Sequence, residues 1–119
     1  MREIVSPAQA IGGMVTLPGD KSISHRYGML ASIAHGVTTI SNYSTGADCQ
    51  STLACMEALG ARIERQDGRV VIHGGALREP DGQLDAGNSG STIRMLSGIL
   101  AGQQFLSRIG GDEIGRAHV

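Results

Sequence analysis

The fold is decided by a loop that opens a helix, Gly87-Asn88-Ser89-Gly90-Ser91-Thr92-Ile93-Arg94. Small polar residues separate its first glycine from the arginine seven positions later, and an apolar helical pattern follows. Such a loop presents backbone N–H groups and a cation at a helix N-terminus, where anions bind well. The stretch therefore predicts an anion-binding helix start.

The same arrangement occurs earlier in the chain, as Gly19-Asp20-Lys21-Ser22-Ile23-Ser24-His25-Arg26. Gly19 matches Gly87 and Arg26 matches Arg94, both at an offset of 68 positions. Each loop follows a short strand-like run and opens a helix. We interpret the pair as an internal repeat, with a chance match of two residues as the alternative. Two such loops predict a small, multiply charged ligand that is held at several points.

Periodicity and turn residues predict alternating strands and helices around these loops. The expected strands are residues 14–17, 37–40, 61–65, 69–73, 83–85 and 104–107, and the expected helices are residues 24–35, 47–59 and 91–101. The order is β-α-β-α-β-β and then β-α-β, which predicts an α/β (α+β) fold. The first unit covers about residues 14–75 and the second begins near residue 83. Such units leave sheet edges and a helix face uncovered, so further copies are expected to complete the architecture.

Apolar residues at helical spacing predict which side of each helix faces the core. They are Tyr27, Leu30, Ala31 and Ala34 in the first helix, Cys49, Thr52, Leu53 and Met56 in the second, and Ile93, Leu96, Ile99 and Leu100 in the third. Gly28 interrupts the first helix at a cost of about 1 kcal/mol relative to alanine. That cost indicates close packing at Gly28.

Composition limits the classes of function. The chain has 119 residues, a net charge of -1 and 3% aromatic residues, so neither nucleic acid nor an anionic membrane is an expected partner. No apolar run reaches the roughly 18 residues of a membrane span, and the N-terminus lacks the layout of a signal peptide. Cys49 and Cys55 lie on different faces of a predicted helix. We interpret them as reduced, partly buried thiols, which favours a cytoplasmic protein.

No motif in the sequence predicts a metal or an organic cofactor. There is no C-x-x-C pair and no His/Cys zinc spacing, and the loops are neither Walker loops nor dinucleotide loops. His25 and His35 are interpreted as surface or packing residues. No Ser/His/Asp set or pair of acids identifies a general acid or base.

Lys21 is the strongest candidate for chemistry, because it stands at a helix start where its ammonium can bind phosphate or carboxylate. The alternative is an ordinary solvated lysine. Ser22 either caps the helix or donates its hydroxyl to a ligand. Arg26, in the expected first turn, opposes the helix dipole, so its position is explained if it binds an anion.

We call residues 19–26 the first loop and residues 87–94 the second loop. Arg94 repeats the argument for Arg26 in the second loop. Asn88 is expected to hold the loop through its own backbone, and Gly90 to let a ligand approach the main chain closely. Asp48, at the start of the second helix, is interpreted as a helix-dipole acid, with a ligand-side role as the alternative.

The last seven residues differ in character from the rest of the chain. Residues 113–119 look like a translated sequencing adapter, so we expect residues 1–112 to be the natural part and residues 113–119 a non-native tail.

Two stretches closely resemble the N-terminal signatures of the 3-phosphoshikimate 1-carboxyvinyltransferase family, the 5-enolpyruvylshikimate-3-phosphate synthases. They are Leu-Pro-Gly-Asp-Lys-Ser-Ile-Ser-His-Arg at 17–26 and Leu-Asp-Ala-Gly-Asn-Ser-Gly-Ser-Thr-Ile-Arg at 84–94. Residues 38–42, Asp48 and residues 58–60 match as well, so the likeness spans nearly all of residues 3–112.

The resemblance implies transfer of the enolpyruvyl group of phosphoenolpyruvate to the 5-hydroxyl of shikimate 3-phosphate, with release of phosphate and no cofactor. It implies a monomeric, two-domain enzyme built from repeated βαβαββ units of the enolpyruvyl transferase fold, of which this chain holds about one and a half. The general base would then lie beyond residue 112, and the fragment alone would be nearly inactive. By position, Lys21 would be catalytic and touch both substrates, and Ser22 and Arg26 would bind shikimate 3-phosphate.

In the second loop, the resemblance implies that Gly90 meets phosphoenolpyruvate through its backbone, while Asn88 and Arg94 hold the loop's shape. Ser89 and Ser91 replace the Ala and Thr of the commonest version of this loop. The resemblance implies that the inhibitor glyphosate occupies the phosphoenolpyruvate position beside this loop. Because of the two serines, sensitivity to glyphosate does not follow from the resemblance.

Two other functions stay open. The sister enzyme that acts on UDP-N-acetylglucosamine shares the fold, but it lacks the Leu-Pro-Gly-x-Lys-Ser opening. A non-catalytic anion-binding module of the same repeat type would keep both loops.

Overall fold

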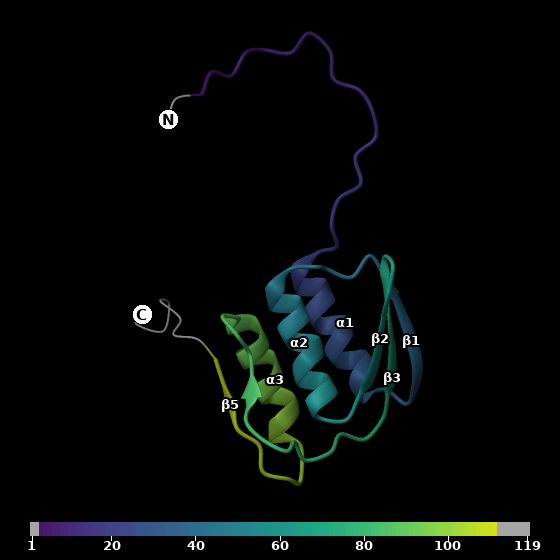
Figure 1. The fold of residues 1–119 in the computed structure, drawn as a ribbon, viewed down its shortest axis with the longest axis vertical. Coiled ribbons are helices and arrows are strands. Elements are labelled where there is room, and N and C mark those ends of the chain that lie inside the picture. Colours follow the sequence, from purple (N-terminus) through teal and green to yellow (C-terminus); the bar gives the residue numbers. More distant parts are fainter. Residues whose placement is uncertain (1–2, 112–119) are drawn as a thin grey trace.

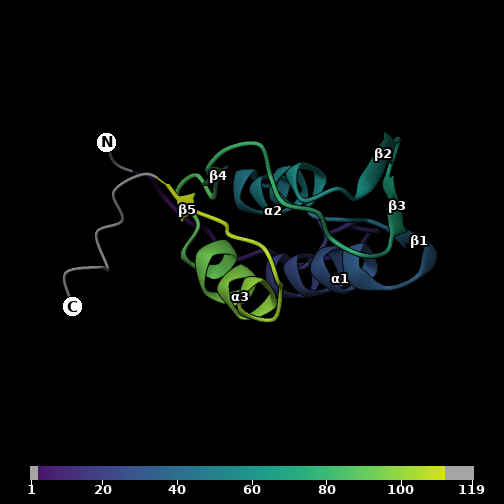
Figure 2. The same cartoon turned by 90° about the horizontal axis from the view of Figure 1, so that it is seen from below.

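Three helices lie side by side at the centre of the computed structural model, which describes residues 3–111 of a mixed α/β fold (Figure 1). They are α1 (Lys21–Ile33), α2 (Ala47–Ala58) and α3 (Gly90–Ala101). A three-stranded sheet packs beside α1 and α2, and a short pair of strands lies on the opposite side of the helices (Figure 2). The helices therefore form the layer that brings distant parts of the chain together.

The three-stranded sheet is antiparallel, with the strand order β1–β3–β2. Its strands are β1 (Gly36–Ser41), β2 (Arg62–Gln66) and β3 (Arg69–Gly74). Asp67 and Gly68 form the turn between β2 and β3, and Gly68 has a φ of +72°, which suits an Asp-Gly hairpin. All three predicted strands in this region are confirmed to within one residue at each end.

The short pair consists of β4 (Leu84–Asp85) and β5 (Ile109–Gly110), which run parallel. Since α3 lies between them in the chain, residues 84–110 form a β-α-β unit. The prediction of a strand at residues 104–107 was wrong. Those residues form a loop, because the partner of Leu84 in the ladder is Ile109.

Residues 3–20 contain no helix or strand and extend away from the helices (Figure 1). The prediction of a strand at residues 14–17 was therefore wrong. Met14, Val15 and Leu17 are 96%, 80% and 70% exposed. A strand needs a neighbour to exchange backbone hydrogen bonds, and within residues 3–111 no strand pairs with this segment.

Helix α1 begins three residues earlier than predicted because Asp20 caps it. The Asp20 carboxylate accepts a hydrogen bond from the Ile23 N–H at 2.8 Å. Ser22 is therefore not the cap, and Arg26 lies in the second turn instead of the first. The cap leaves the first residue of the helix, Lys21, with its side chain available.

The buried side of α1 also differs from the prediction. Tyr27 and Leu30 are each 56% exposed, and Ala34 is exposed as well. The buried side is made mainly of small and polar residues: Ser24, His25, Gly28, Met29, Ala31 and Ser32. These permit close packing, since a Cβ on Gly28 would lie 3.1 Å from the Tyr43 hydroxyl. The interpretation of Gly28 as a packing glycine is confirmed.

The apolar residues of α1 form an exposed stripe instead. Ile23, 49% exposed, lies one turn before Tyr27 and two turns before Leu30. We call these three residues the exposed stripe. Nothing in residues 3–111 covers it.

Helix α2 is confirmed to within one residue, and its predicted inner residues are all fully buried: Cys49, Thr52, Leu53 and Met56. Both cysteines are free and face different neighbours, as expected. The Cys49 thiol donates to the Lys21 carbonyl oxygen at 3.5 Å, and the Cys55 thiol to the Asp85 carbonyl oxygen at 3.3 Å. Burial raises the pKa of Cys55 to about 11, so it remains a thiol at neutral pH.

Helix α3 is likewise confirmed to within one residue. Of its four predicted inner residues, Leu96 is fully buried, whereas Ile93, Ile99 and Leu100 are half-buried. Helix α3 contacts α1 and α2, and Arg94, Ser97 and Gly98 on its outer side are exposed.

Candidate functional site

The two loops meet because α1 and α3 contact each other and both pack against α2. All three helices begin at the same end of the molecule (Figure 1). Helix N-termini carry unpaired N–H groups and a positive partial charge. Their convergence makes this end suited to an anion.

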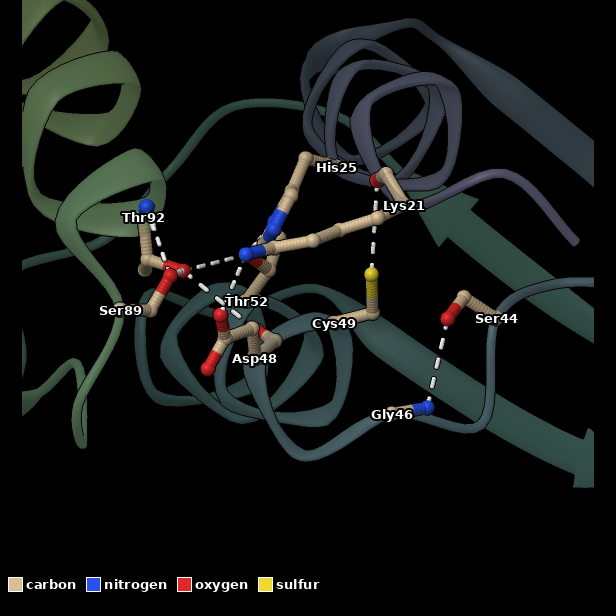
Figure 3. A network of polar contacts seen from close by, with 9 residues as sticks. All are labelled: Lys21, His25, Ser44, Gly46, Asp48, Cys49, Thr52, Ser89 and Thr92. Carbon is tan, nitrogen blue, oxygen red and sulfur yellow. Dashed lines mark hydrogen bonds and ion pairs between the residues drawn. The ribbon is translucent and has the colours of Figure 1, made fainter. Parts of the chain in front are cut away.

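The Lys21 side chain links the first loop to the start of α2. Its Nζ lies 2.6 Å from Oδ2 of Asp48, which belongs to the first turn of α2. Figure 3 shows Lys21 extending over this helix start toward Ser89 and Thr92 of the second loop and α3. Asp48 is thus a helix-dipole acid that also holds the candidate lysine. The Lys21 side chain remains 54% exposed, so a ligand can reach it.

Ser22 and Arg26 lie one helical turn apart on α1, and both are exposed. Within residues 3–111, neither side chain forms an ion pair or hydrogen bond. The Arg26 guanidinium is therefore available to an anion beside the first loop.

The second loop is held by residues other than the one expected. The Asp85 carboxylate accepts a hydrogen bond from the Gly87 N–H at 2.8 Å, and Ser89 Oγ caps α3 by accepting from the Thr92 N–H at 3.0 Å. Gly87 has a φ of +59°, a conformation that favours glycine. Asn88 is exposed, and its side chain forms no hydrogen bond with the rest of residues 3–111. The expectation that Asn88 holds the loop through its own backbone was wrong, because Asp85 and Ser89 do so.

The second loop leads into Gly90, the first residue of α3, whose N–H is among those with no acceptor inside the helix. Arg94 is exposed on the same helix. Arg94 follows its N-cap, Ser89, by five positions, whereas Arg26 follows Asp20 by six. One residue corresponds to about 100° around a helix, so the two arginines do not occupy equivalent positions. The repeat interpretation stays a prediction.

A buried set of polar side chains lies beneath the two loops: His25, Thr52, Ser89 and Thr92. The sequence left His25 as either a surface or a packing residue, and it assigned no site role to the side chains of the other three. The one indication in the sequence was Thr52, a polar residue among those predicted to face the core from the second helix. Burial, helped by the charge of Lys21, lowers the pKa of His25 and favours its neutral ring.

The site is an open surface in the described part of the chain. Two cavities there, of about 270 and 140 Å³, are lined by other segments: residues 79–83 with 106–108, and residues around Tyr43 and Arg65. Across residues 3–111, no group of three or more His, Cys, Asp or Glu side chains is placed to hold a metal ion. Nor does any described helix combine the length and apolar character needed to cross a membrane.

Comparisons with known proteins place this arrangement in context. The sequence profile described as EPSP synthase (3-phosphoshikimate 1-carboxyvinyltransferase) matches residues 5–117. A 3-phosphoshikimate 1-carboxyvinyltransferase of Solibacter usitatus is 64% identical over 116 residues, which cover 95% of this chain and 27% of that protein. A 3-phosphoshikimate 1-carboxyvinyltransferase of Bacillus subtilis is 51% identical over 108 residues, which cover 88% of this chain and 25% of that protein.

A solved structure gives the same picture. The EPSP synthase from Acinetobacter baumannii superposes with a TM-score of 0.80 at 43% identity, covering 84% of this chain and 24% of that one. The chain thus spans about a quarter of the length of the proteins it matches. The matched profile includes most of residues 113–119, which lie outside the described residues, so the expectation of a non-native tail stays a prediction.

Proposed function

This chain belongs to the EPSP synthase (3-phosphoshikimate 1-carboxyvinyltransferase) family, and we propose that it forms part of a shikimate-pathway enolpyruvyl transferase. The reaction would move the enolpyruvyl group of phosphoenolpyruvate to the 5-hydroxyl of shikimate 3-phosphate and release phosphate. One observation carries the proposal beyond family membership. The two loops meet at one end of the helices, with the Lys21 ammonium reaching from the first toward the second.

The charges at this site support a role in binding both substrates, which are multiply charged anions. An ammonium has three donors, so Lys21 can keep its contact with Asp48 while it donates to a ligand. Ser22 and Arg26 form an adjoining exposed face for the phosphate of shikimate 3-phosphate. A charge-assisted hydrogen bond to such a group contributes about 1.5–3 kcal/mol.

In the second loop, we propose that the Gly90 N–H binds phosphoenolpyruvate, helped by the positive end of α3. Arg94 would add positive charge beside the loop, and Asn88, exposed and without a partner among residues 3–111, would be free to face a ligand. Groups placed in advance around developing charge lower a reaction barrier by electrostatic stabilisation. The general base is expected outside residues 1–112, so we expect the 119-residue chain alone to be nearly inactive. The cytoplasmic location and the monomeric state of the whole enzyme also stay predictions.

Calorimetry with shikimate 3-phosphate tests the first loop. We expect Lys21→Ala and Arg26→Ala each to weaken binding at least about tenfold, the loss of one charge-assisted hydrogen bond. Arg69→Ala is the matched control, because Arg69 is an exposed arginine on β3 whose side chain donates to Gln66 instead. Equal affinity in the parent and both loop variants would overturn the site assignment.

Two further measurements separate the other functions. Binding of UDP-N-acetylglucosamine in preference to shikimate 3-phosphate would favour the sister enzyme. Sequencing the source DNA past residue 112 tests the non-catalytic module, because a stop codon there favours the module and further repeat units favour the enzyme. Measurable turnover by the 119-residue chain would contradict the expectation that it is inactive alone.

A further inference from the structure

A continuous line of hydrogen bonds crosses the interior from α1 to the second loop. His25 Nδ1 lies 2.6 Å from Thr52 Oγ1, which lies 2.9 Å from Thr92 Oγ1. Thr92 Oγ1 lies 2.7 Å from Ser89 Oγ. We call these four residues the polar relay. All four are 0% exposed, and they come from α1, α2, α3 and the cap of α3 (Figure 3).

The direction of these hydrogen bonds is inferred from the geometry at Thr92, whose hydroxyl is placed as the donor to Ser89 and to the Asp48 carbonyl oxygen. Thr92 donates its single hydroxyl proton to Ser89 Oγ, with the Asp48 carbonyl oxygen, which can only accept, 3.4 Å away. That proton is then not available to Thr52, so Thr52 must donate to Thr92. The Thr52 oxygen is left as an acceptor, and His25 Nδ1 must be its donor.

This direction agrees with the other nitrogen of the ring. His25 Nε2 is buried and has no partner among the described residues. If Nδ1 carries the proton of a neutral ring, Nε2 is a bare acceptor. Among backbone groups, a buried N–H donor is left unpaired less often than a buried carbonyl acceptor, and we infer the same preference for the ring nitrogens. Burial, which lowers the pKa of His25, favours the same neutral state.

We propose that the polar relay fixes the second loop in position relative to Lys21, so that His25 and Thr52 are positioning residues for the ligand site. His25 lies one turn after Lys21 on α1, and Ser89 lies between Asn88 and Gly90 in the second loop. Hydrogen bonds have preferred directions and apolar contacts do not, so a relay aligns two helices more narrowly than packing does. Its role in ligand binding rests on the proposed function, whereas its geometry does not.

Nuclear magnetic resonance of the His25 ring tests the geometry without a ligand. In the unsubstituted chain, long-range ¹H–¹⁵N correlation should show Nδ1 protonated and Nε2 bare. The other tautomer, or an even mixture of the two, would overturn the proposal. This measurement needs no variant, so it remains decisive even if a substitution prevents folding.

Thr52→Val tests whether the relay reaches the second loop. It removes one hydroxyl at almost constant volume, and we expect the Thr92 amide to exchange about two- to tenfold faster, with loss of the single His25 tautomer. Thr52→Ser should restore both signals. Thr39→Val, the same change at an exposed position on β1, is the control. Unchanged exchange at Thr92 in a folded Thr52→Val chain would contradict the relay.

A ligand measurement then separates the two proposals. We expect Thr52→Val to weaken phosphoenolpyruvate binding about fivefold or more, with Thr52→Ser near the parent value. If the parent binds no phosphoenolpyruvate but has the expected tautomer and exchange, the proposed binding of phosphoenolpyruvate by the second loop fails and the relay geometry stands. If the parent binds and Thr52→Val binds equally well, the positioning role fails and the proposed function stands.

Discussion

The N-termini of α1 and α3 differ in how they are held. Asp20 caps α1 from an exposed position, and Lys21 beside it is reachable from solvent. Ser89 caps α3 from a fully buried position and takes part in the polar relay. The first loop therefore contributes accessible charge, whereas the second contributes a main chain whose place is set by the interior. Two helix starts that look alike in sequence can thus supply different parts of one site.

Removing each cap in turn is the strongest test of this difference between α1 and α3. Ser89→Ala deletes the cap of α3 and removes the nearer acceptor of the Thr92 hydroxyl, leaving only the Asp48 carbonyl oxygen at 3.4 Å, so we expect a loss of about 2–3 kcal/mol in the free energy of unfolding. Asp20→Ala deletes an exposed cap and should cost about 1 kcal/mol. Urea unfolding followed by circular dichroism gives both values. Equal losses would show that burial of the second cap has no energetic consequence.

A smaller effect is expected from Gly87→Ala, which tests the backbone of the second loop. A left-handed conformation costs a residue with a Cβ about 1–2 kcal/mol. The new methyl group would also meet Ser51 Oγ at 2.9 Å, although that side chain can rotate away. Gly82→Ala, where a Cβ would meet nothing within 4 Å, is the control. Thermal unfolding of both variants measures the difference, and equal midpoints would argue against backbone strain in the loop.

The pH dependence of stability tests the buried end of the relay. His25 has a lowered pKa because burial, and then the charge of Lys21, disfavour its charged form. The unfolded chain then binds more protons than the folded chain as the pH falls below the usual value of 6.5. Stability should therefore fall from about pH 6.5 downward, until the folded pKa is passed.

Two comparisons isolate His25 in that pH titration. His25→Asn should flatten the decline just below pH 6.5, whereas His35→Asn, at an exposed position, should not. Glu64, whose pKa is lowered chiefly by a hydrogen bond from Arg62, loses its contribution only as the pH falls below 4.5. An unchanged slope near pH 6 in His25→Asn would contradict the assignment.

The smallest expected effect is at the ion pair that joins the first loop to α2. Asp48→Asn removes the partner of Lys21 and one acid from a helix start, and we expect it to cost less than about 1 kcal/mol because the pair is partly exposed. It should nevertheless free the Lys21 ammonium, the only lysine in the sequence, whose single side-chain resonance can be followed. An unchanged resonance would show that the pair does not persist in solution.

The sequence predicted best where hydrophobic periodicity governs the structure. The four inner residues of α2 and the Asp-Gly hairpin were correct because burial of apolar side chains and turn chemistry decide them locally. Glycine and small polar residues located the start of α3 to within one residue, whereas the start of α1 was placed three residues too late. These features depend on neighbours in the sequence, which a single chain displays directly.

Prediction was wrong where a distant partner governs the structure. The buried side of α1 is chosen by Ser24 and His25, which have partners on other segments. Tyr27, Leu30 and Ala34 were therefore assigned inward by mistake, whereas Ala31 is buried as predicted. The strand expected at residues 14–17 has no partner among residues 3–111, and β5 is placed by its pairing with Leu84. The polar relay could not be predicted, because nothing local connects Thr52 with Thr92.

The exposed stripe on α1 gives the isolated chain the character of a surfactant. One side of the helix is apolar and exposed, while Ser22 and Arg26 on an adjoining side are polar and exposed. Such a molecule collects at air–water boundaries and on plastic, so dilute samples lose proportionally more material than concentrated ones. We expect covering Ile23, Tyr27 and Leu30 to reduce this adsorption.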